Sequence, residues 1–257
     1  MKVEVFTKGK VPERNEDYFA NTETSFVAVD GATDKSGRLY GGKTGGEIVA
    51  KLVGDHAVQS PLNGVPLVEH LNDLVRCEYE KLGIIDDITD PRMRFTCGFI
   101  TARIIEDEVV ITYLGDLGFR VNGQDVYQEV KRTDTRAAQA RAEYIERTRD
   151  VAGSRDAIKH LLSYPYQNKG DDPLGFGVID GTVTPEKFVK EFRYKRAELR
   201  TLELFSDGYF KAGEEPTIES WERAYQEVEA EDPDKWKIYK SSKSTDDRLI
   251  AIIEFED

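Results

Sequence analysis

Short apolar segments rich in β-branched residues constrain the fold more than any other feature of this chain. Residues 95–105 and 109–114 both have this character, and only a short polar turn separates them. Another pair of segments flanks Asn122-Gly123, one of the strongest short signals for a β-hairpin. Strands joined by such tight turns run antiparallel. The remaining predicted strands are residues 3–6, 25–30, 119–121, 125–130, 202–206 and 249–255.

Helical periodicity occurs in blocks and does not alternate regularly with the strands. Apolar residues recur at helical spacing in residues 45–57 and 66–82, and Pro66 suits a helix start. Residues 135–165 and 216–238 also look helical and are strongly charged. Because strictly alternating βαβ units are missing, a parallel nucleotide-binding sheet is disfavoured. We predict an α+β fold with sheet and helix layers, forming a single domain over residues 1–257.

Net charge and apolar patterning exclude several classes of partner. The chain of 257 residues has a formal net charge of −13, which repels nucleic-acid backbones and anionic lipid. No apolar run approaches the roughly 20 residues of a membrane span, and the N-terminus lacks a signal-peptide pattern. We therefore expect no nucleic-acid or membrane partner. A cytoplasmic location and a monomeric state are the default expectations.

Four aspartates share one context, at or beside the end of an apolar strand. Asp30, Asp116 and Asp207 each adjoin a glycine after a predicted strand, and Asp246 precedes the last strand. A single Asp-Gly pair in this position is usually only a turn. Four such acids in one domain are harder to explain in that way, because strand ends at one edge of a sheet can gather them.

The residue types available favour a metal site with oxygen ligands. Gathered carboxylates repel one another unless a cation neutralises them, and oxygen ligands select Mg²⁺ or Mn²⁺ over zinc. With three histidines and two dispersed cysteines, a site rich in nitrogen or sulfur is not expected. Ser206 lacks the Gly-x-Ser-x-Gly elbow of serine hydrolases, and Cys97 lies within an apolar strand, so neither is favoured as a nucleophile.

Read in order, these segments resemble the PP2C (PPM) family of metal-dependent serine/threonine protein phosphatases, in a divergent, bacterial-type form. The matches cover nearly the whole chain, and together they are more specific than any one of them. They are Arg14-Asn15-Glu16-Asp17, residues 27–31 (VAVDG), Gly45-Gly46-Glu47, Thr96-Cys97-Gly98, Gly115-Asp116, Ser206-Asp207-Gly208 and Asp246-Asp247.

The resemblance implies a role for each matched acid. Asp30 would contact two divalent cations and through them hold the water that attacks phosphorus. Glu16 and the carbonyl of Gly31 would complete one metal site. Asp207 and Asp246 would complete the other.

The same resemblance also implies a third metal and a phosphate contact. Asp116 would help to hold a third, weaker ion. Pro12 stands where the family has its phosphate-binding arginine. Arg14 is the substitute that we expect, with Lys8 and Lys10 as alternatives.

The family's fold is a sandwich of two antiparallel β-sheets flanked by pairs of antiparallel helices. The implied activity is hydrolysis of phosphoserine and phosphothreonine in a protein partner, with Mn²⁺ or Mg²⁺ as cofactor. Two alternatives stay open: a catalytically weak, phosphatase-like binding or regulatory module, and a small-molecule phosphomonoesterase that uses the same metals. Residues 135–165 are either a docking flap or solvated surface.

Overall fold

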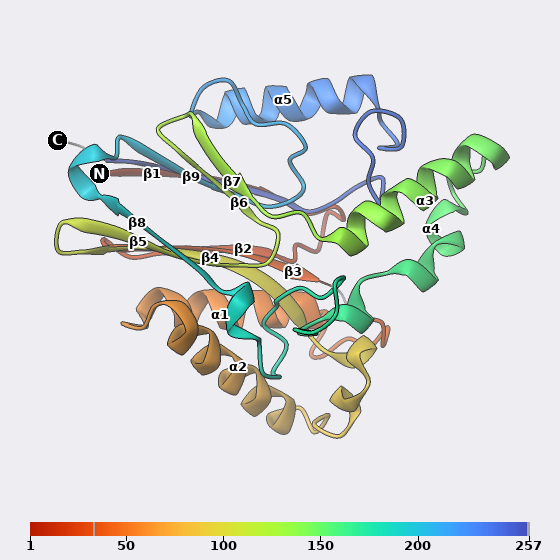
Figure 1. Ribbon diagram of the computed structural model, residues 1–257, viewed down its shortest axis with the longest axis horizontal. Helices are drawn as coiled ribbons and strands as arrows, with labels where there is room; N and C mark the ends of the chain where they lie inside the picture. The colour runs from red at the N-terminus through yellow and green to blue at the C-terminus, as the bar shows by residue number, and fades with distance from the viewer. Residues whose placement is uncertain (33, 256–257) are drawn as a thin grey trace.

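The computed structural model describes residues 1–32 and 34–255, which form a sandwich of two antiparallel sheets (Figure 1). The first sheet has the strand order β1 (Lys2–Lys8), β10 (Arg248–Glu254), β9 (Thr201–Phe205), β6 (Gly118–Val121) and β7 (Asp125–Gln128). The second sheet has the order β2 (Asp17–Asn21), β3 (Ser25–Ala32), β4 (Thr96–Ile105), β5 (Glu108–Leu114) and β8 (Lys190–Lys195).

The central strand β3 is buried on both of its faces, which explains why its sequence is an unbroken apolar run. Phe26 and Ala28 point into the core between the two sheets. Val27 and Val29 point the other way and pack in the core beneath the helices. Since side chains alternate along a strand, Asp30 continues the row that faces the sandwich interior.

Helices cover the outer faces of both sheets. The helices α1 (Gly45–Gln59) and α2 (Gly64–Lys81) pack against the second sheet, as Figure 1 shows. α5 (Ile218–Glu231) covers the first sheet, where Trp221 contacts the core residues Phe205 and Ile250. α1 begins with a capping box, in which Thr44 accepts from the Glu47 amide and Glu47 accepts from the Thr44 amide.

The structure confirms the predicted α+β sandwich and differs from expectation in two details. The helix expected over residues 216–238 is shorter in the structure, where α5 ends at Glu231. The charged segment expected as a helix over residues 135–165 consists of α3 (Arg132–Thr148), the short α4 (Ser154–Ala157) and 3₁₀ turns. α3 and α4 project from one end of the sandwich (Figure 1). No helix of the described chain is long and apolar enough to span a membrane.

Antiparallel pairing brings several strand ends to the end of the sandwich from which α3 projects. Asp17, at the start of β2, pairs in register with Asp30 near the end of β3. In the first sheet, β9 ends just before Asp207 and β10 begins just after Asp246. The predicted acids therefore come from both sheets and face one region.

Candidate active site

A cleft of about 710 Å³ lies at this end of the sandwich. Arg14 does not line it; this side chain is exposed, and Lys10 is the N-terminal cation that the cleft contains. The other site residues predicted from the sequence all line the cleft: Glu16, Asp30, Gly31, Asp116, Asp207 and Asp246.

Asp30, Asp207 and Asp246 form the centre of the cleft. The carboxyl groups of Asp30 and Asp246 lie close enough to Asp207 to influence its pKa. Neighbouring carboxyl groups repel one another unless they are protonated or a cation lies between them. Acids from both sheets are thus brought together in the cleft.

Burial and mutual repulsion shift the pKa values of these acids. Burial in the cleft raises the pKa of Asp30 well above its usual range, and the charges of Asp207, Asp17 and Asp116 raise it further. Burial also raises the pKa of Asp246, to about 7, although Lys243 opposes this shift. For Asp207 burial acts in the same direction, but the ammonium groups of Lys243 and Lys131 outweigh it and lower the pKa.

Glu16 and Gly31 lie where the N-terminus of α1 approaches β3. The Glu16 carboxylate accepts from the Thr44 hydroxyl at 2.7 Å and from the Lys10 ammonium at 3.0 Å. The Gly31 amide donates to the Glu16 carbonyl at 2.9 Å. A Cβ atom on Gly31 would lie 2.6 Å from the Gly46 carbonyl oxygen, so the close approach of loop and helix requires glycine here.

Asp17 and Ser206 belong to the site, although the sequence reasoning assigned no role to either. The Ser206 hydroxyl donates to the Asp17 carboxylate at 2.6 Å and accepts from the Leu249 amide at 2.9 Å. This contact joins the second sheet to the first beneath the clustered acids. Burial raises the pKa of Asp17, and the Ser206 hydrogen bond opposes that rise. The sequence pattern that could have identified Asp17 is the alternation of side chains along β2. This alternation places Asp17 on the same face as Phe19, which packs against the core.

Lysines neutralise part of the acidic charge. The Lys131 ammonium lies 2.7 Å from the Asp116 carboxylate. Lys243 contacts Asp246 and lies 3.9 Å from Asp207. At the rim, the Lys10 ammonium lies 3.1 Å from Asp247 as well as bonding Glu16.

The donor set fits hard divalent cations in its chemistry. Its potential ligands are carboxylates, and burial together with the neighbouring acids raises the pKa of Asp30. Across residues 1–32 and 34–255, no three acidic, histidine or cysteine side chains are already arranged around one point as a metal-binding group. The Lys243 ammonium contacts Asp246, one of the acids expected as a ligand.

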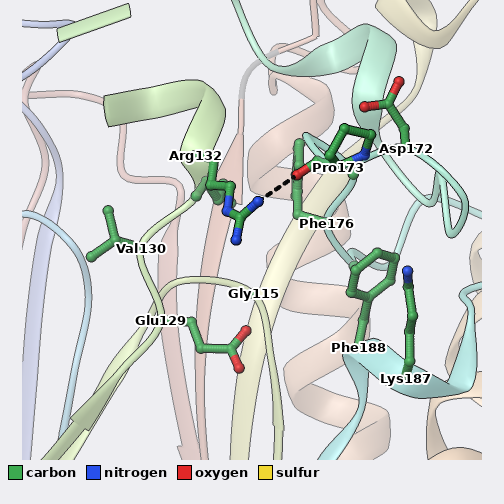
Figure 2. A pocket seen from close by; sticks show the side chains of 12 residues that line it. Gly115, Glu129, Val130, Arg132, Asp172, Pro173, Phe176, Lys187 and Phe188 are labelled. Atoms are coloured by element: carbon green, nitrogen blue, oxygen red, sulfur yellow. Dashed lines mark hydrogen bonds between the residues drawn. The ribbon is translucent and has the colours of Figure 1, made fainter. Parts of the chain in front are cut away.

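A smaller pocket of about 350 Å³ adjoins the cleft and shares with it the segment 129–131. Figure 2 shows Phe176 and Phe188 on one side of this pocket and Arg132 reaching across it. The Arg132 guanidinium donates to the Pro173 carbonyl at 3.4 Å. The pocket therefore combines an apolar wall with charged side chains, and it adjoins the cleft.

Comparisons with known proteins identify the fold. No protein-family model and no curated protein matches the chain. Among solved structures, the serine/threonine phosphatase Stp1 from Staphylococcus aureus is 15% identical with a TM-score of 0.52, covering 100% of this chain and 95% of its own. The phosphatase PstP/Ppp of Mycobacterium tuberculosis is 11% identical with a TM-score of 0.55, covering 100% and 99%. The catalytic domain of PstP in complex with two manganese ions is 12% identical with a TM-score of 0.53, covering 100% and 98%.

These full-length matches confirm the fold that the sequence resemblance implied. At such low identity they show the architecture and not the activity. The chain has the PP2C-like fold of the bacterial serine/threonine phosphatases.

Proposed function

We propose that this chain is a metal-dependent phosphoprotein phosphatase that hydrolyses phosphoserine or phosphothreonine. The observation that carries the proposal is the convergence of Asp30, Asp207 and Asp246 at the strand ends, with the pKa of Asp30 raised by burial and repulsion. The two manganese ions in the PstP structure support it, because that protein has the same fold.

Asp30, Asp207 and Asp246 would hold Mn²⁺ or Mg²⁺, together with Glu16 and the Gly31 carbonyl. Asp116 would serve a third, weaker ion. When bound, such ions supply an activated water and neutralise charge on the phosphoryl group.

Water is the nucleophile that the described side chains favour. The Ser206 hydroxyl is already engaged by Asp17 and by the Leu249 amide, so it is poorly placed to attack a substrate. Burial raises the pKa of the Cys97 thiol well above its usual range, which keeps it protonated and unreactive. Both observations support direct hydrolysis without a covalent intermediate.

A protein substrate is favoured over a small phosphomonoester by the second pocket. Its apolar wall of Phe176 and Phe188, beside the cleft, can receive residues that flank a phosphorylated side chain (Figure 2). A small phosphomonoester would leave this pocket unused.

Hydrolysis assays with two substrates test the proposal. p-Nitrophenyl phosphate and a phosphothreonine peptide are each assayed with Mn²⁺, with Mg²⁺ and with EDTA. We expect metal-dependent release of phosphate from both, with a higher kcat/KM for the peptide. Undiminished hydrolysis after exhaustive EDTA treatment contradicts the metal mechanism. A kcat/KM that is lower for the peptide than for p-nitrophenyl phosphate favours a small substrate.

A phosphatase-like binding module is the second candidate, and Lys243 is the observation that favours it. Its ammonium contacts Asp246 and lies near Asp207, where a divalent cation would compete with it. If this module is the function, the phosphopeptide binds without turnover. Lys243→Met then strengthens Mn²⁺ binding in calorimetry but restores no hydrolysis.

A further inference from the structure

Cationic side chains from several elements line the cleft, and several of them are matched by carboxylates. Because a carboxylate already neutralises each of these paired lysines and arginines, they are less suited to bind an anionic ligand. The pairs are Lys10 with Glu16 and Asp247, Lys131 with Asp116, Lys243 with Asp246, Arg92 with Asp90, and Arg94 with Asp180.

Arg155 on α4 lines the same cleft and differs from these residues. Its Nη1 donates to the Ser242 carbonyl at 2.7 Å, which fixes the guanidinium beside the segment that contains Lys243. In the described part of the chain, Asp134 and Asp246 attract Arg155 without forming an ion pair with it. The guanidinium therefore keeps hydrogen-bond donors and a charge close to the central acids.

Lys35 approaches the cleft from the loop after β3. Its backbone amide donates to the Arg92 carbonyl at 2.7 Å. The neighbouring Asp34 is buried and accepts from the Ser36 amide at 2.8 Å, which holds the loop in place. Lys35 and Arg155 both line the cleft, and the pKa of Lys35 is lowered by burial and, to a smaller extent, by the positive charge of Arg155.

Two cations that line one cleft are suited to binding an anion there. The planar guanidinium group can donate two parallel hydrogen bonds to phosphate oxygens, and an ammonium group adds a compact charge. The arginine that the PP2C family would place at residue 12 is proline here. A phosphate contact from elsewhere in the chain would compensate for its absence.

We propose that Arg155 and Lys35 together bind the phosphoryl group of the substrate. The inference rests on the proposed function, since it names the contact that holds the phosphate at that site. It also assigns a function to the charged segment 132–157, because α3 and α4 position Arg155 at the cleft. Arg155 and Lys35 are binding residues in this proposal and take no part in the chemical step.

Arg155→Gln and Lys35→Met test the proposal through substrate affinity. With p-nitrophenyl phosphate and Mg²⁺, we expect the KM to rise about 10- to 100-fold, as expected for loss of a hydrogen bond to a charged group. We expect kcat to change less, and the inhibition constant of inorganic phosphate to rise in parallel with KM. Arg155→Lys keeps the charge but loses the planar fork, so its KM should lie between those of the native chain and Arg155→Gln.

Matched controls are available near each position. Arg147 on α3 and Lys43 before α1 are exposed and lie outside the cleft lining. Arg147→Gln and Lys43→Met should leave KM unchanged. Melting curves identify any variant that has lost its fold, and Arg155→Lys keeps the test usable if Arg155→Gln is unstable.

A second readout needs no turnover. Inorganic phosphate in the presence of Mg²⁺ should raise the Tm of the native chain, and this rise should be lost in Arg155→Gln and Lys35→Met. If the native chain hydrolyses no substrate, but phosphate raises its Tm and does not raise that of the two variants, the phosphate site is supported and the proposed catalysis is rejected. Metal-dependent hydrolysis with unchanged KM and unchanged phosphate protection in both variants overturns the inference and leaves the proposed function intact.

Discussion

The molecule buries two groups of charged side chains, and they differ in how their charge is balanced. Between the first sheet and α5, Arg120 pairs with Glu203: the guanidinium Nε donates to the carboxylate at 2.8 Å, and Trp221 donates to the same carboxylate at 2.7 Å. The remaining guanidinium nitrogens donate to the carbonyls of Gly213 and Glu215. Each charged group there has its partners within the protein.

The cleft is different, because its acids face one another. Burial and neighbouring carboxylates raise the pKa of Asp30, and Lys243 relieves only part of the charge on Asp246. A closed ion pair of the Arg120–Glu203 kind stabilises a packing arrangement. Unbalanced charge in a cleft, with shifted pKa values, indicates a place where a ligand completes the balance.

The largest expected effect is on the balanced pair. Glu203→Ala leaves Arg120 buried without its counter-charge, and we expect the free energy of unfolding to fall by about 3–5 kcal/mol. Urea titration measures the loss. The double variant Arg120→Met with Glu203→Leu should recover only part of it, since an apolar pair needs no counter-charge but leaves the Trp221 indole and the Gly213 carbonyl without these partners. A loss below about 1 kcal/mol in the single variant would contradict this account of the pair.

The second prediction distinguishes the acids of the cleft from the Arg120–Glu203 pair by their effect on hydrolysis. Asp30→Asn removes a central carboxylate, and we expect hydrolysis to fall at least about 100-fold, because lesser changes around metal ligands already cost about 10- to 100-fold. Without metal, its Tm should stay constant or rise, since one repelling charge is gone. Asp55→Asn on the surface of α1 is the control; it loses an exposed ion pair with Lys51 at 2.7 Å, and its amide oxygen can still accept from the Tyr18 hydroxyl. Equal losses of activity in both folded variants would show that the site is misplaced.

A third prediction concerns metal binding in the absence of substrate. Mn²⁺ that binds only the folded chain should raise the Tm with concentration, corresponding to about 2.7 kcal/mol at 100 times the Kd. The increase should be lost in Asp30→Asn and kept in Glu203→Asp, if the latter folds. Identical melting curves with EDTA and with millimolar Mn²⁺ would show that the clustered acids do not bind the ion.

The smallest expected effect is the pH dependence of the metal-free chain. Burial raises the pKa of Asp246 to about 7; Asp207 adds to the shift, whereas Lys243 and Lys10 oppose it. The folded state therefore binds more protons than the unfolded state, and stability is lost as the pH rises through 7. The slope for one proton is at most about 1.4 kcal/mol per pH unit. Urea titrations in EDTA at pH 6 and pH 8 measure it, and Asp246→Asn should reduce it.

Most of the fold could be predicted because its signals are local. The apolar runs of β3, β4 and β10 are long and buried on both faces, so they can be recognised from composition alone. The sequence reasoning missed β2 and β8, which form the two edges of the second sheet. An edge strand is partly exposed and carries mixed side chains, as the alternating exposure of β8 shows.

The acids of the site were also predictable, whereas their partners were not. Asp30 and Asp207 stand beside glycines at strand ends, which is a pattern visible in a few residues. The contacts of Lys10 with Asp247 and of Ser206 with Asp17 join residues far apart in the chain. Only the tertiary register of the two sheets creates these contacts, and no local pattern in the sequence carries that register.

The pairing of β10 between β1 and β9 has a consequence for protein synthesis. β10 is synthesised after β1 and β9, yet it occupies the position between them in the first sheet. A nascent chain that still lacks residues 246–254 has an unfilled gap beside β1 and an incomplete acid cluster. The first sheet and the acid cluster are therefore completed only once this strand has been synthesised.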